Sequence, residues 1–455
     1  MSPSSERPLP LGEFLPADRW QTHVNCLFYG MLGSGIHRHF QTYVSRDHRL
    51  AYCLADEFLE QCPAGDSTCF IQEWGVGNGN LAACFLDRLK AGDPEGRVYP
   101  RVHYLLCDYS RAILTAACSR LQAHAGRFSA VLMDAEGPAC FKPRSIHKIL
   151  SNEIWDDLAA KVLWKDDGLL YEEYLCPTLP PRPDGMDFES FKHFFAEKNP
   201  DGLADAPLDQ IVWERVWQRV DTSDWPFSRL VEAHSEKLAE RVAVPVNLGA
   251  LACLQRAWEL LAPDGLGYSG LDYGMLSFDD LNQQGRPWFN IYGGQYTAMV
   301  NFPLLAEVGR KIGFRPVSLE HQHRYVSRRL GEKVAGAVEL VQSHPRIERM
   351  APWDRDILML GTLHALNGVY QSPYDHKMEY PPSPGTPKKQ RKTIRRLAET
   401  LSRRGVPDTV AYVTEGEVFA VVKSLLKLGY RENDLRRAFD LFRGPVSFVH
   451  AGFRK

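Results

Sequence analysis

Residues 68–80 read TCFIQEWGVGNGN, and the predicted fold class follows from this segment. Thr68–Trp74 is a short apolar run that predicts a strand, Gly75–Asn80 predicts a turn, and Leu81–Lys90 predicts a helix. A glycine-rich turn in this setting lets a ligand approach the backbone, and the following helix N-terminus offers it free N–H groups. The stretch therefore predicts the first strand, ligand loop and helix of an α/β domain.

Strands and helices alternate on both sides of a long interruption. After the first unit, the pattern predicts a strand at Val102–Tyr109, a helix at Arg111–Ala125, and strands at Ser129–Met133 and His147–Ser151. Beyond the interruption it predicts a helix at Leu248–Leu261, a strand at Leu266–Asp272, a helix at Phe302–Ile312 and a strand at Phe314–Leu319. Such alternation predicts a parallel sheet with helices on both faces.

The same pass along the chain divides it into segments. Their predicted bounds are 1–20 (flexible N-terminal segment), 21–159 (first, ligand-binding half of the α/β domain), 160–245 (insertion for a substrate or partner, partly helical), 246–330 (second half of the α/β domain), 331–370 (helical extension), 371–392 (Pro/Ser/Lys-rich linker) and 393–455 (small, mostly helical tail). A second helix is predicted within 46–61, before the glycine-rich stretch.

Composition excludes several classes of protein. The chain has 455 residues, a net charge of -2 and 44% hydrophobic residues, so no strong overall field draws it to nucleic acid or to a membrane. None of its ten cysteines forms a CxxC pair, which argues against zinc; Cys69 and Cys107 are interpreted as small buried hydrophobes. We expect a reducing, cytoplasmic setting, since the N-terminus lacks an apolar targeting segment and no run is long enough to span a membrane.

The spacing of the glycines separates two kinds of ligand loop. Dinucleotide binders use GxGxxG, whereas this chain has Glu73-x-Gly75-x-Gly77-x-Gly79 with Asn80 at the place of the third dinucleotide glycine. This spacing resembles the loop of class I methyltransferases, whose cofactor S-adenosylmethionine has no pyrophosphate. Glu73 suits the ammonium of that cofactor, and the alternative is that the glycines only form a tight turn.

The next two strands end in residues that support the same ligand. Asp108, followed by Tyr109, ends the second strand, where an acid can accept both hydroxyls of a ribose. The third strand ends in Met133, Asp134 and Ala135, and in the class I methyltransferases an acid here commonly meets the adenine amino group. An Asp is also common wherever a strand meets a turn, which is the alternative for Asp134.

The fourth predicted strand runs into Asn152-Glu153-Ile-Trp-Asp156-Asp157. Ligands bind at the carboxyl ends of strands in open α/β sheets, so Asn152 is placed to face a methyl donor. Glu153, Asp156 and Asp157 are the predicted catalytic residues, able to clamp a guanidinium or to act as a general base on an amine or hydroxyl. The alternative is a cluster that caps the next helix.

This string also resembles the Asn-Glu-x-x-Asp-Ala-Leu motif of the MidA family of methyltransferases, which includes a mitochondrial complex I assembly factor that methylates a protein arginine. Further matching strings occur in the same order, at Phe40-Gln-Thr42, Glu73–Gly79, Leu271-Asp272-Tyr273-Gly274 and Thr297-Ala-Met-Val-Asn301-Phe302. The resemblance covers roughly residues 25–325. It implies a Rossmann-like class I fold, S-adenosylmethionine as cofactor and a protein substrate.

The chain departs from the family at four places. It has Arg38-His39 for Gly-Asp, Tyr43-Val44 for Ser-Pro, Pro245-Val246-Asn247-Leu248 for Glu-Val-Ser-Pro, and Asp157 for Ala. These changes leave cofactor binding intact and put the substrate in doubt, so arginine is one candidate acceptor. Methyltransferases that act on RNA or a small molecule, and a non-catalytic scaffold that keeps the fold, are the alternatives.

Three other features point less strongly to chemistry. His321 and His323 would share a face of a strand, but no third ligand stands near them in the sequence, and we predict no metal site. The basic run within 388–404 could contact nucleic acid, although a solvated helix face is favoured because no aromatic residues are interleaved. The tryptophans around the insertion could line a groove, with core packing as the preferred reading.

Overall fold

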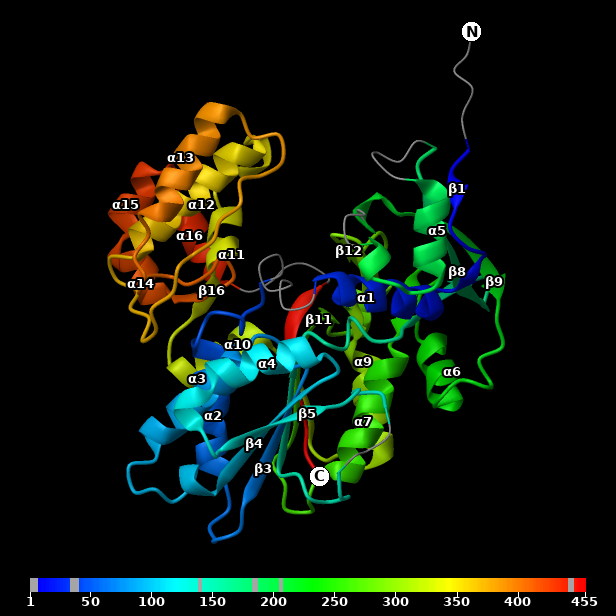
Figure 1. Ribbon diagram of the computed structural model, residues 1–455, viewed down its shortest axis with the longest axis horizontal. Coiled ribbons are helices and arrows are strands. Elements are labelled where there is room, and N and C mark those ends of the chain that lie inside the picture. Colours follow the sequence, from blue (N-terminus) through cyan, green and yellow to red (C-terminus); the bar gives the residue numbers. More distant parts are fainter. Residues whose placement is uncertain (1–6, 33–40, 138–140, 182–186, 204–207, 441–445) are drawn as a thin grey trace.

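The computed structural model describes residues 7–32, 41–137, 141–181, 187–203, 208–440 and 446–455. Phe40, Arg38 and His39 of the sequence motifs lie outside these residues. Figure 1 shows three regions: a central sheet with its helices, a second sheet on the right around α1, and a bundle of short helices at the upper left.

The central sheet follows the order β5-β4-β3-β6-β11-β18-β15, with β14 beside β11. Its strands are β3 (Cys69–Trp74), β4 (Val102–Asp108), β5 (Phe128–Leu132), β6 (Lys148–Asn152), β11 (Gly267–Met275), β14 (Val300–Asn301), β15 (Val317–His321) and β18 (Ser447–Phe453). The neighbours of β3, β4 and β6 are all parallel, whereas β18 runs antiparallel to β11 and β15. A parallel sheet with one antiparallel strand between its fifth and sixth members is the arrangement of the class I methyltransferase fold, and the predicted fold class is confirmed.

Helices cover both faces of this sheet because both faces of its central strands are apolar. On one face lie α2 (Arg49–Gln61), α3 (Asn80–Gly92), α4 (Arg111–Arg120) and α10 (Gln322–Leu330); on the other lie α7 (Leu248–Leu260) and α9 (Phe302–Ile312). The two faces of β4 show the division, since Leu106 packs with the first group and Leu105 with the second. The elements predicted from the alternating pattern are thus present, with ends that differ by a few residues.

The insertion is mainly an antiparallel sheet, and the prediction of a partly helical segment missed it. Its strands are β1 (Leu9–Pro10), β2 (Leu15–Pro16), β7 (Lys161–Asp166), β8 (Leu169–Leu179), β9 (Val212–Arg219) and β10 (Ala243–Val246). With it lie α1 (Ala17–Leu32), α5 (Phe188–Ala196), α6 (Ser228–Glu236), α8 (Phe278–Asn282) and the hairpin β12 (Phe289–Tyr292)–β13 (Gln295–Ala298). The run VWERVWQR of β9 alternates with period two, which is the signal that could have identified the sheet.

The N-terminal segment is part of this second sheet. The expectation of a flexible segment over residues 1–20 is wrong for its described part, because Leu11, Ala17 and Trp20 are buried in the core of the insertion. The first strands pair with β8, and α1 packs across the same sheet. Two regions far apart in sequence therefore form one unit.

The C-terminal helices form a bundle with its own core. They are α11 (Ala337–Gln342), α12 (Pro352–Leu366), α13 (Lys388–Glu399), α14 (Glu415–Ala420), α15 (Val422–Lys427) and α16 (Glu432–Phe439), with a two-stranded antiparallel sheet of β16 (Val334–Gly336) and β17 (Tyr412–Thr414). The segment predicted as a linker, 371–392, packs on this bundle: Met378 is buried in its core and the Tyr380 hydroxyl donates to Asp356 Oδ1 at 3.1 Å.

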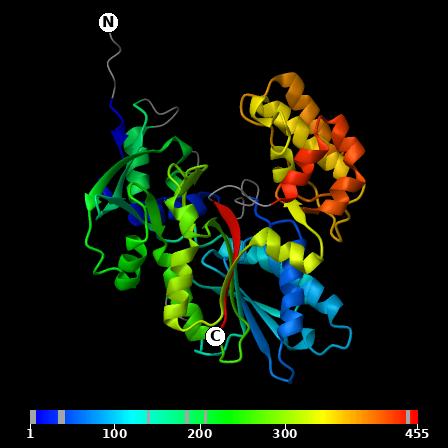
Figure 2. The same cartoon turned by 180° about the vertical axis from the view of Figure 1, so that it is seen from behind.

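The last strand corrects the prediction for residues 393–455. We expected a helical tail, but the chain leaves the bundle and returns to the central sheet as β18, the red strand that crosses the middle of Figure 2. Phe453 is fully buried against Tyr268 and Phe314. The C-terminus is therefore a structural part of the α/β domain.

Candidate active site

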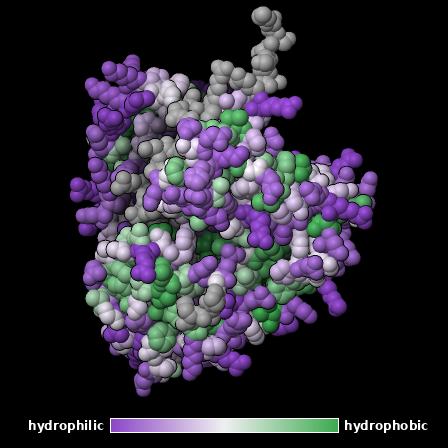
Figure 3. Space-filling model, turned by 45° about the vertical axis from the view of Figure 1, so that its right-hand side comes forward, coloured by the Kyte–Doolittle hydropathy of each residue, from purple (hydrophilic) through white to green (hydrophobic). Residues whose placement is uncertain are grey.

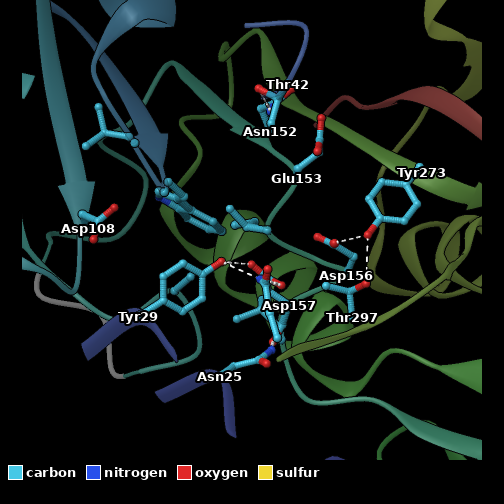
Figure 4. A pocket seen from close by; sticks show the side chains of 18 of the residues that line it. Asn25, Tyr29, Thr42, Asp108, Asn152, Glu153, Asp156, Asp157, Tyr273 and Thr297 are labelled. Carbon is cyan, nitrogen blue, oxygen red and sulfur yellow. Dashed lines mark hydrogen bonds between the residues drawn. The ribbon is translucent and has the colours of Figure 1, made fainter. Parts of the chain in front are cut away.

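A cavity of about 880 Å³ lies at the carboxyl ends of the central strands (Figure 4). Its walls come from the loops after β3, β4, β5 and β6, from the end of β11, from α1 and from the hairpin β12–β13. Cavities of about 300–1,000 Å³ hold small organic ligands. The site thus lies where the sequence predicted it, between the central sheet and the insertion.

The glycine-rich loop is fixed by its backbone. The N–H groups of Gly75 and Val76 donate to the Cys107 carbonyl oxygen of β4, at 2.9 and 3.3 Å. Gly75 has a φ of +71°, and a Cβ there would lie 2.4 Å from Ile154 Cγ2. Gly77, with a φ of +54°, also lines the cavity. The loop therefore needs glycine at Gly75 to pass between two neighbouring loops.

Gly79 and Asn80 differ from the prediction, because the structure places them behind the loop and not on the cavity wall. A Cβ at Gly79 would lie 3.0 Å from Ala117 Cα, so this glycine allows α3 and α4 to approach. The buried Asn80 amide donates to the carbonyl oxygens of Val44 and Asp47, at 2.6 and 2.9 Å. Both residues support the loop through packing, and Asn78 lies on the cavity wall instead.

Glu73 and Asp108 end β3 and β4 at the cavity, as predicted. Burial raises the pKa of Glu73 to about 8, although the Tyr104 hydroxyl donates to Glu73 Oε2 at 2.7 Å. Burial also raises the pKa of Asp108 to about 6, against the backbone hydrogen bond from Ser110 at 2.9 Å. A carboxylate with a raised pKa is stabilised by a cation or by hydroxyl donors, so both side chains fit a ligand that carries these groups.

The residues after β5 form a more exposed part of the wall. Asp134 and Ala135 line the cavity, and Asp134 Oδ1 accepts a hydrogen bond from the Glu136 N–H at 2.9 Å. Tyr109 is 55% exposed and its ring meets that of Tyr29 edge-on, at 5.9 Å between centroids. The predicted adenine-side residues therefore lie together at the side of the cavity nearest β4 and β5.

Asn152 and Glu153 follow β6 directly. The Asn152 amide donates to Thr42 Oγ1 at 3.3 Å, while its Oδ1 is buried with no hydrogen-bond partner among the described residues. Glu153 has a φ of +49°, a strained conformation for a residue with a side chain, and its N–H donates to the Leu271 carbonyl oxygen at 2.7 Å. Burial raises the pKa of Glu153 to about 8, and Asp156 adds to the effect.

The Asp156 side chain is held by the hydroxyl of Tyr273, which in turn contacts Thr297. The Tyr273 hydroxyl, at the end of β11, donates to Asp156 Oδ2 at 2.6 Å and lies 3.0 Å from Thr297 Oγ1 of β13 (Figure 4). Burial raises the pKa of Asp156 to about 6, and the hydrogen bond from Tyr273 opposes the increase. Asp156 Oδ1 is buried with no hydrogen-bond partner among the described residues. This oxygen is therefore available to a ligand.

Asp157, which replaces the family's Ala, has both oxygens occupied. The Tyr29 hydroxyl donates to Oδ2 and the Gln295 amide donates to Oδ1. Burial raises the pKa of Asp157, and the charge of Asp156 raises it further. Asp157 therefore joins α1 to the hairpin β12–β13 at the cavity wall, whereas Glu153 and Asp156 remain open to a ligand.

The strings that resemble the MidA family meet at one loop. Asp272 Oδ2 accepts hydrogen bonds from the N–H groups of Trp155 and Asp156, at 2.9 and 3.3 Å. The Asn152–Asp157 string, after β6, is thus held by the Leu271–Gly274 string of β11. The string at Thr297 supplies a further contact through Tyr273.

Sequence reasoning missed the contribution of α1. The Gln21 amide donates to the Asp156 carbonyl oxygen at 2.9 Å, and the Asn25 amide donates to those of Asp157 and Tyr296 at 3.1 and 2.9 Å. These residues share one helix face, but nothing in the sequence indicated that this face would meet a loop more than a hundred residues away. Glu136 of the cavity wall was also missed; burial raises its pKa to about 7.

The Asp, Glu, Lys, Arg and His positions on the cavity wall are all occupied by acidic residues among the described residues. Seven carboxyl groups line it among the described residues, which include no Lys, Arg or His there: Glu73, Asp108, Asp134, Glu136, Glu153, Asp156 and Asp157. Burial raises the pKa values of most of these groups, and a cation in the site would favour their ionised form and be attracted to it. The cavity therefore fits cationic ligands.

The remaining candidate features lie elsewhere. His321 ends β15 and His323 belongs to α10, where its Nε2 lies 2.8 Å from Glu339 Oε2, so the two do not share a strand face. The basic run forms α13 and the loop after it, with exposed side chains in the helical bundle, whose surface is largely purple at the upper left of Figure 3. Within the described part of the chain, no helix has the length and apolar composition that a membrane span requires.

Comparison with known proteins gives likenesses of structure only. No family model and no curated protein matches the chain. The chain is similar to a COG1565 superfamily member. That structure, from Burkholderia thailandensis and bound to S-adenosyl-homocysteine, has a TM-score of 0.47 and 16% identity, over 72% of this chain and 76% of that one. A phosphoethanolamine N-methyltransferase 2 from Haemonchus contortus, in complex with S-adenosyl-L-methionine, has a TM-score of 0.33 and 11% identity, over 95% of this chain and 56% of that one.

Proposed function

We propose that this protein is an S-adenosylmethionine-dependent methyltransferase whose acceptor is a basic nitrogen of a protein side chain, with arginine favoured. The observation that carries the proposal is the cavity wall, on which seven carboxyl groups gather without a cation in the described residues. The cofactor carries a sulfonium and an ammonium, and an arginine or amine acceptor adds a further cation. A polyanion such as RNA brings no positive charge to the same wall.

The residues on one side of the cavity fit the cofactor. Gly75 and Gly77 have no side chains, so the cofactor can approach the backbone of this turn. Glu73 provides a carboxyl group for an ammonium. Asp108, on the opposite side of Figure 4 from Asp156, suits a pair of ribose hydroxyls. When bound, the cofactor supplies a methyl group on a sulfonium, which is already activated for transfer to a nucleophile.

The residues on the other side fit a nitrogen donor. Asn152 Oδ1 and Asp156 Oδ1 both lack a hydrogen-bond partner among the described residues, and both are acceptors. A buried acceptor without a donor is costly, so these atoms favour a ligand that brings N–H groups. A guanidinium, with five N–H donors in a planar array, can satisfy both.

The chain's own residues then orient the acceptor and receive its proton. Glu153 and Asp156 have pKa values raised to about 8 and about 6, which places a general base near neutral pH. Tyr273 holds Asp156 through Oδ2, so Oδ1 is the atom that takes the proton. Proximity supplies much of the rate of such a reaction, because the donor needs no further activation.

The test is a transfer assay with the full-length protein. Incubation with label on the cofactor methyl and a cell lysate should label a protease-sensitive fraction, and its acid hydrolysate should contain methylarginine. Asp156→Asn keeps the shape of the side chain, so cofactor affinity should stay within about twofold while transfer falls at least about a hundredfold, the scale of a lost general base. The exposed Asp66→Asn is the control and should leave both unchanged.

Other outcomes contradict defined parts of the proposal. A nuclease-sensitive label would indicate an RNA acceptor and overturn the cation argument. Label on lysine would exclude arginine but keep the basic nitrogen. Cofactor binding without transfer to any fraction would indicate a non-catalytic protein that retains the fold.

A further inference from the structure

Cys62 and Cys69 lie at the end of the sheet away from the cavity. Cys62 follows the last residue of α2, Cys69 begins β3, and an exposed loop over residues 64–68 connects them. Their sulfur atoms are 3.8 Å apart, although the chain has no CxxC pair and Cys69 was interpreted as a small buried hydrophobe. Cys62 and Cys69 are too far apart in the sequence to form a CxxC motif, but the turn between them brings their sulfur atoms together.

A guanidinium lies beside this pair. Arg101 Nη2 is 3.5 Å from Cys69 Sγ, and the same side chain donates to the carbonyl oxygens of Ser67 and Pro63, each at 3.0 Å. The arginine is thus anchored to the loop that carries the cysteines. A fixed positive charge next to sulfur favours the thiolate, which is the reactive form.

We propose that Cys62 and Cys69 are a redox-active pair that forms a reversible disulfide on reaction with an organic disulfide such as oxidised glutathione. Cys62 is partly exposed and is the sulfur that the reagent can reach, whereas Cys69 is buried behind it. This inference concerns the amino end of β3 and does not depend on the methyltransferase proposal.

The electrostatics around Cys69 agree with this geometry. A hydrogen bond from the Cys62 thiol lowers the pKa of Cys69 to about 7, and Arg101 lowers it further, whereas burial and the charge of Asp264 oppose the shift. The same hydrogen bond to Cys69 raises the pKa of Cys62, burial and the charge of Cys69 raise it further, and Arg101 opposes the shift. The pair therefore holds a single proton near neutral pH, shared between two adjacent sulfurs.

The reaction proceeds in two balanced exchanges. Cys62 Sγ passes its hydrogen-bonded proton to Cys69 as it attacks one sulfur of oxidised glutathione; the S–S bond of the reagent breaks, a mixed disulfide forms, and the glutathione thiolate that leaves takes the proton from Cys69. The Cys69 thiolate then attacks Cys62 Sγ and releases the second glutathione as a thiolate. The two cysteines lose two electrons, which reduce the reagent to one thiol and one thiolate, and the single proton of the pair ends on the thiol.

The cross-link would join the end of α2 to the start of β3. A disulfide stabilises a fold mainly by restricting the unfolded chain, so the oxidised protein should melt at a higher temperature. Its effect on the cavity should be small, because the strand of six residues from Cys69 to Trp74 separates the two sites by roughly 20 Å at ~3.3 Å per residue. Cofactor affinity should therefore stay within about twofold.

The experiment uses the full-length, folded protein. After incubation with oxidised glutathione, free thiols are blocked with N-ethylmaleimide and the digest is analysed by mass spectrometry. We expect a Cys62–Cys69 cross-linked peptide, lost on addition of dithiothreitol. Cys118→Ser, which removes another partly exposed cysteine, should still give it; Cys69→Ser should stop at the mixed disulfide on Cys62.

Arg101 variants separate activation from a merely structural role. Arg101→Gln should slow cross-linking at least about threefold near pH 7 and much less near pH 9, where the thiolate forms without help; Arg101→Lys should restore most of the rate. The proposal is wrong if folded wild-type protein accumulates only the mixed disulfide, if both cysteines stay open to N-ethylmaleimide, or if the cross-link requires denaturant.

Discussion

The Tyr273 hydroxyl lies 2.6 Å from Asp156 Oδ2 and donates a hydrogen bond to it, although 117 residues separate the two in the chain. Tyr273 lies near the carboxyl end of β11 and Asp156 follows β6, and these strands are parallel neighbours in the sheet. Adjacent carboxyl ends therefore bring together the proposed base and the group that orients it. Tyr273 keeps one oxygen of Asp156 occupied and leaves the other for a ligand.

Tyr273→Phe should test this relationship. The change removes the hydroxyl and keeps the ring, so cofactor affinity should stay within about twofold while transfer falls about tenfold or more. Because the hydrogen bond lowers the pKa of Asp156, its loss should raise that pKa above about 6 and move the acidic limb of the pH–rate profile to higher pH. Tyr325→Phe is the matched control, since it removes a 2.7 Å bond to Glu57 outside the cavity. An unmoved acidic limb would show that Asp156 is not the titrating base.

Gly77→Ala should weaken cofactor binding at least about tenfold, because the added methyl group occupies space at the cavity wall. Its φ of +54° also costs the variant roughly 1 kcal/mol of stability. Gly126→Ala provides the control, with a φ of +82° and no atom within 4 Å of the added Cβ. Titration calorimetry should show weaker binding in the first variant only; equal affinities would remove Gly77 from the cofactor site.

Asp108→Asn should weaken cofactor binding by about 1–3 kcal/mol, the range for hydrogen bonds to a charged group. The pKa of Asp108 is raised to about 6 by burial, so affinity for the wild-type protein should also fall as the pH drops below this value and the carboxylate is lost. Calorimetry at a series of pH values measures both effects. Asp66→Asn, at an exposed side chain, is the control and should keep full cofactor affinity. If Asp108→Asn keeps full affinity, or if both variants lose affinity equally, the ribose is held elsewhere.

The ligand-free protein should lose stability as the pH rises. Burial raises the pKa values of Glu73 and Glu153 to about 8, above the ordinary value of about 4.3 in the unfolded chain. Between these limits the folded state binds more protons than the unfolded state, so the free energy of unfolding decreases with increasing pH. Urea denaturation should show this decrease between about pH 5 and about pH 8. Glu153→Gln should flatten it and exposed Glu95→Gln should not; an identical slope in both would contradict the assignment.

Phe453→Ala should destabilise the α/β domain by about 3–5 kcal/mol, because it empties a fully buried site in the last strand. Phe14→Ala, at a side chain that is 38% exposed, should cost much less. Urea denaturation of the two variants makes the comparison. Equal losses would mean that β18 adds little to the central sheet.

The α/β core and the residues at the carboxyl ends of its strands could be predicted from the amino-acid pattern alone. Alternating strands and helices locate β3, β4, β5 and β6 within a residue or two, because the pattern is local and both faces of the strands are apolar. Glu73, Asp108 and Glu153 were predicted because they lie at or beside strand ends, and Asp156 because it lies in the loop after β6; a parallel sheet places these positions at one edge. The one-sided charge of the site follows from these residue types.

Which of these residues remain open to a ligand depends on contacts that form only in the folded protein. Asp157 is occupied by Tyr29 and Gln295, and Asn80 by backbone carbonyl oxygens, since partners from remote segments meet them after folding. The same holds for β18, whose place between β11 and β15 depends on pairing with strands far back in the chain. Sequence patterns report local periodicity and burial, whereas pairing across more than a hundred residues depends on how all the elements pack together.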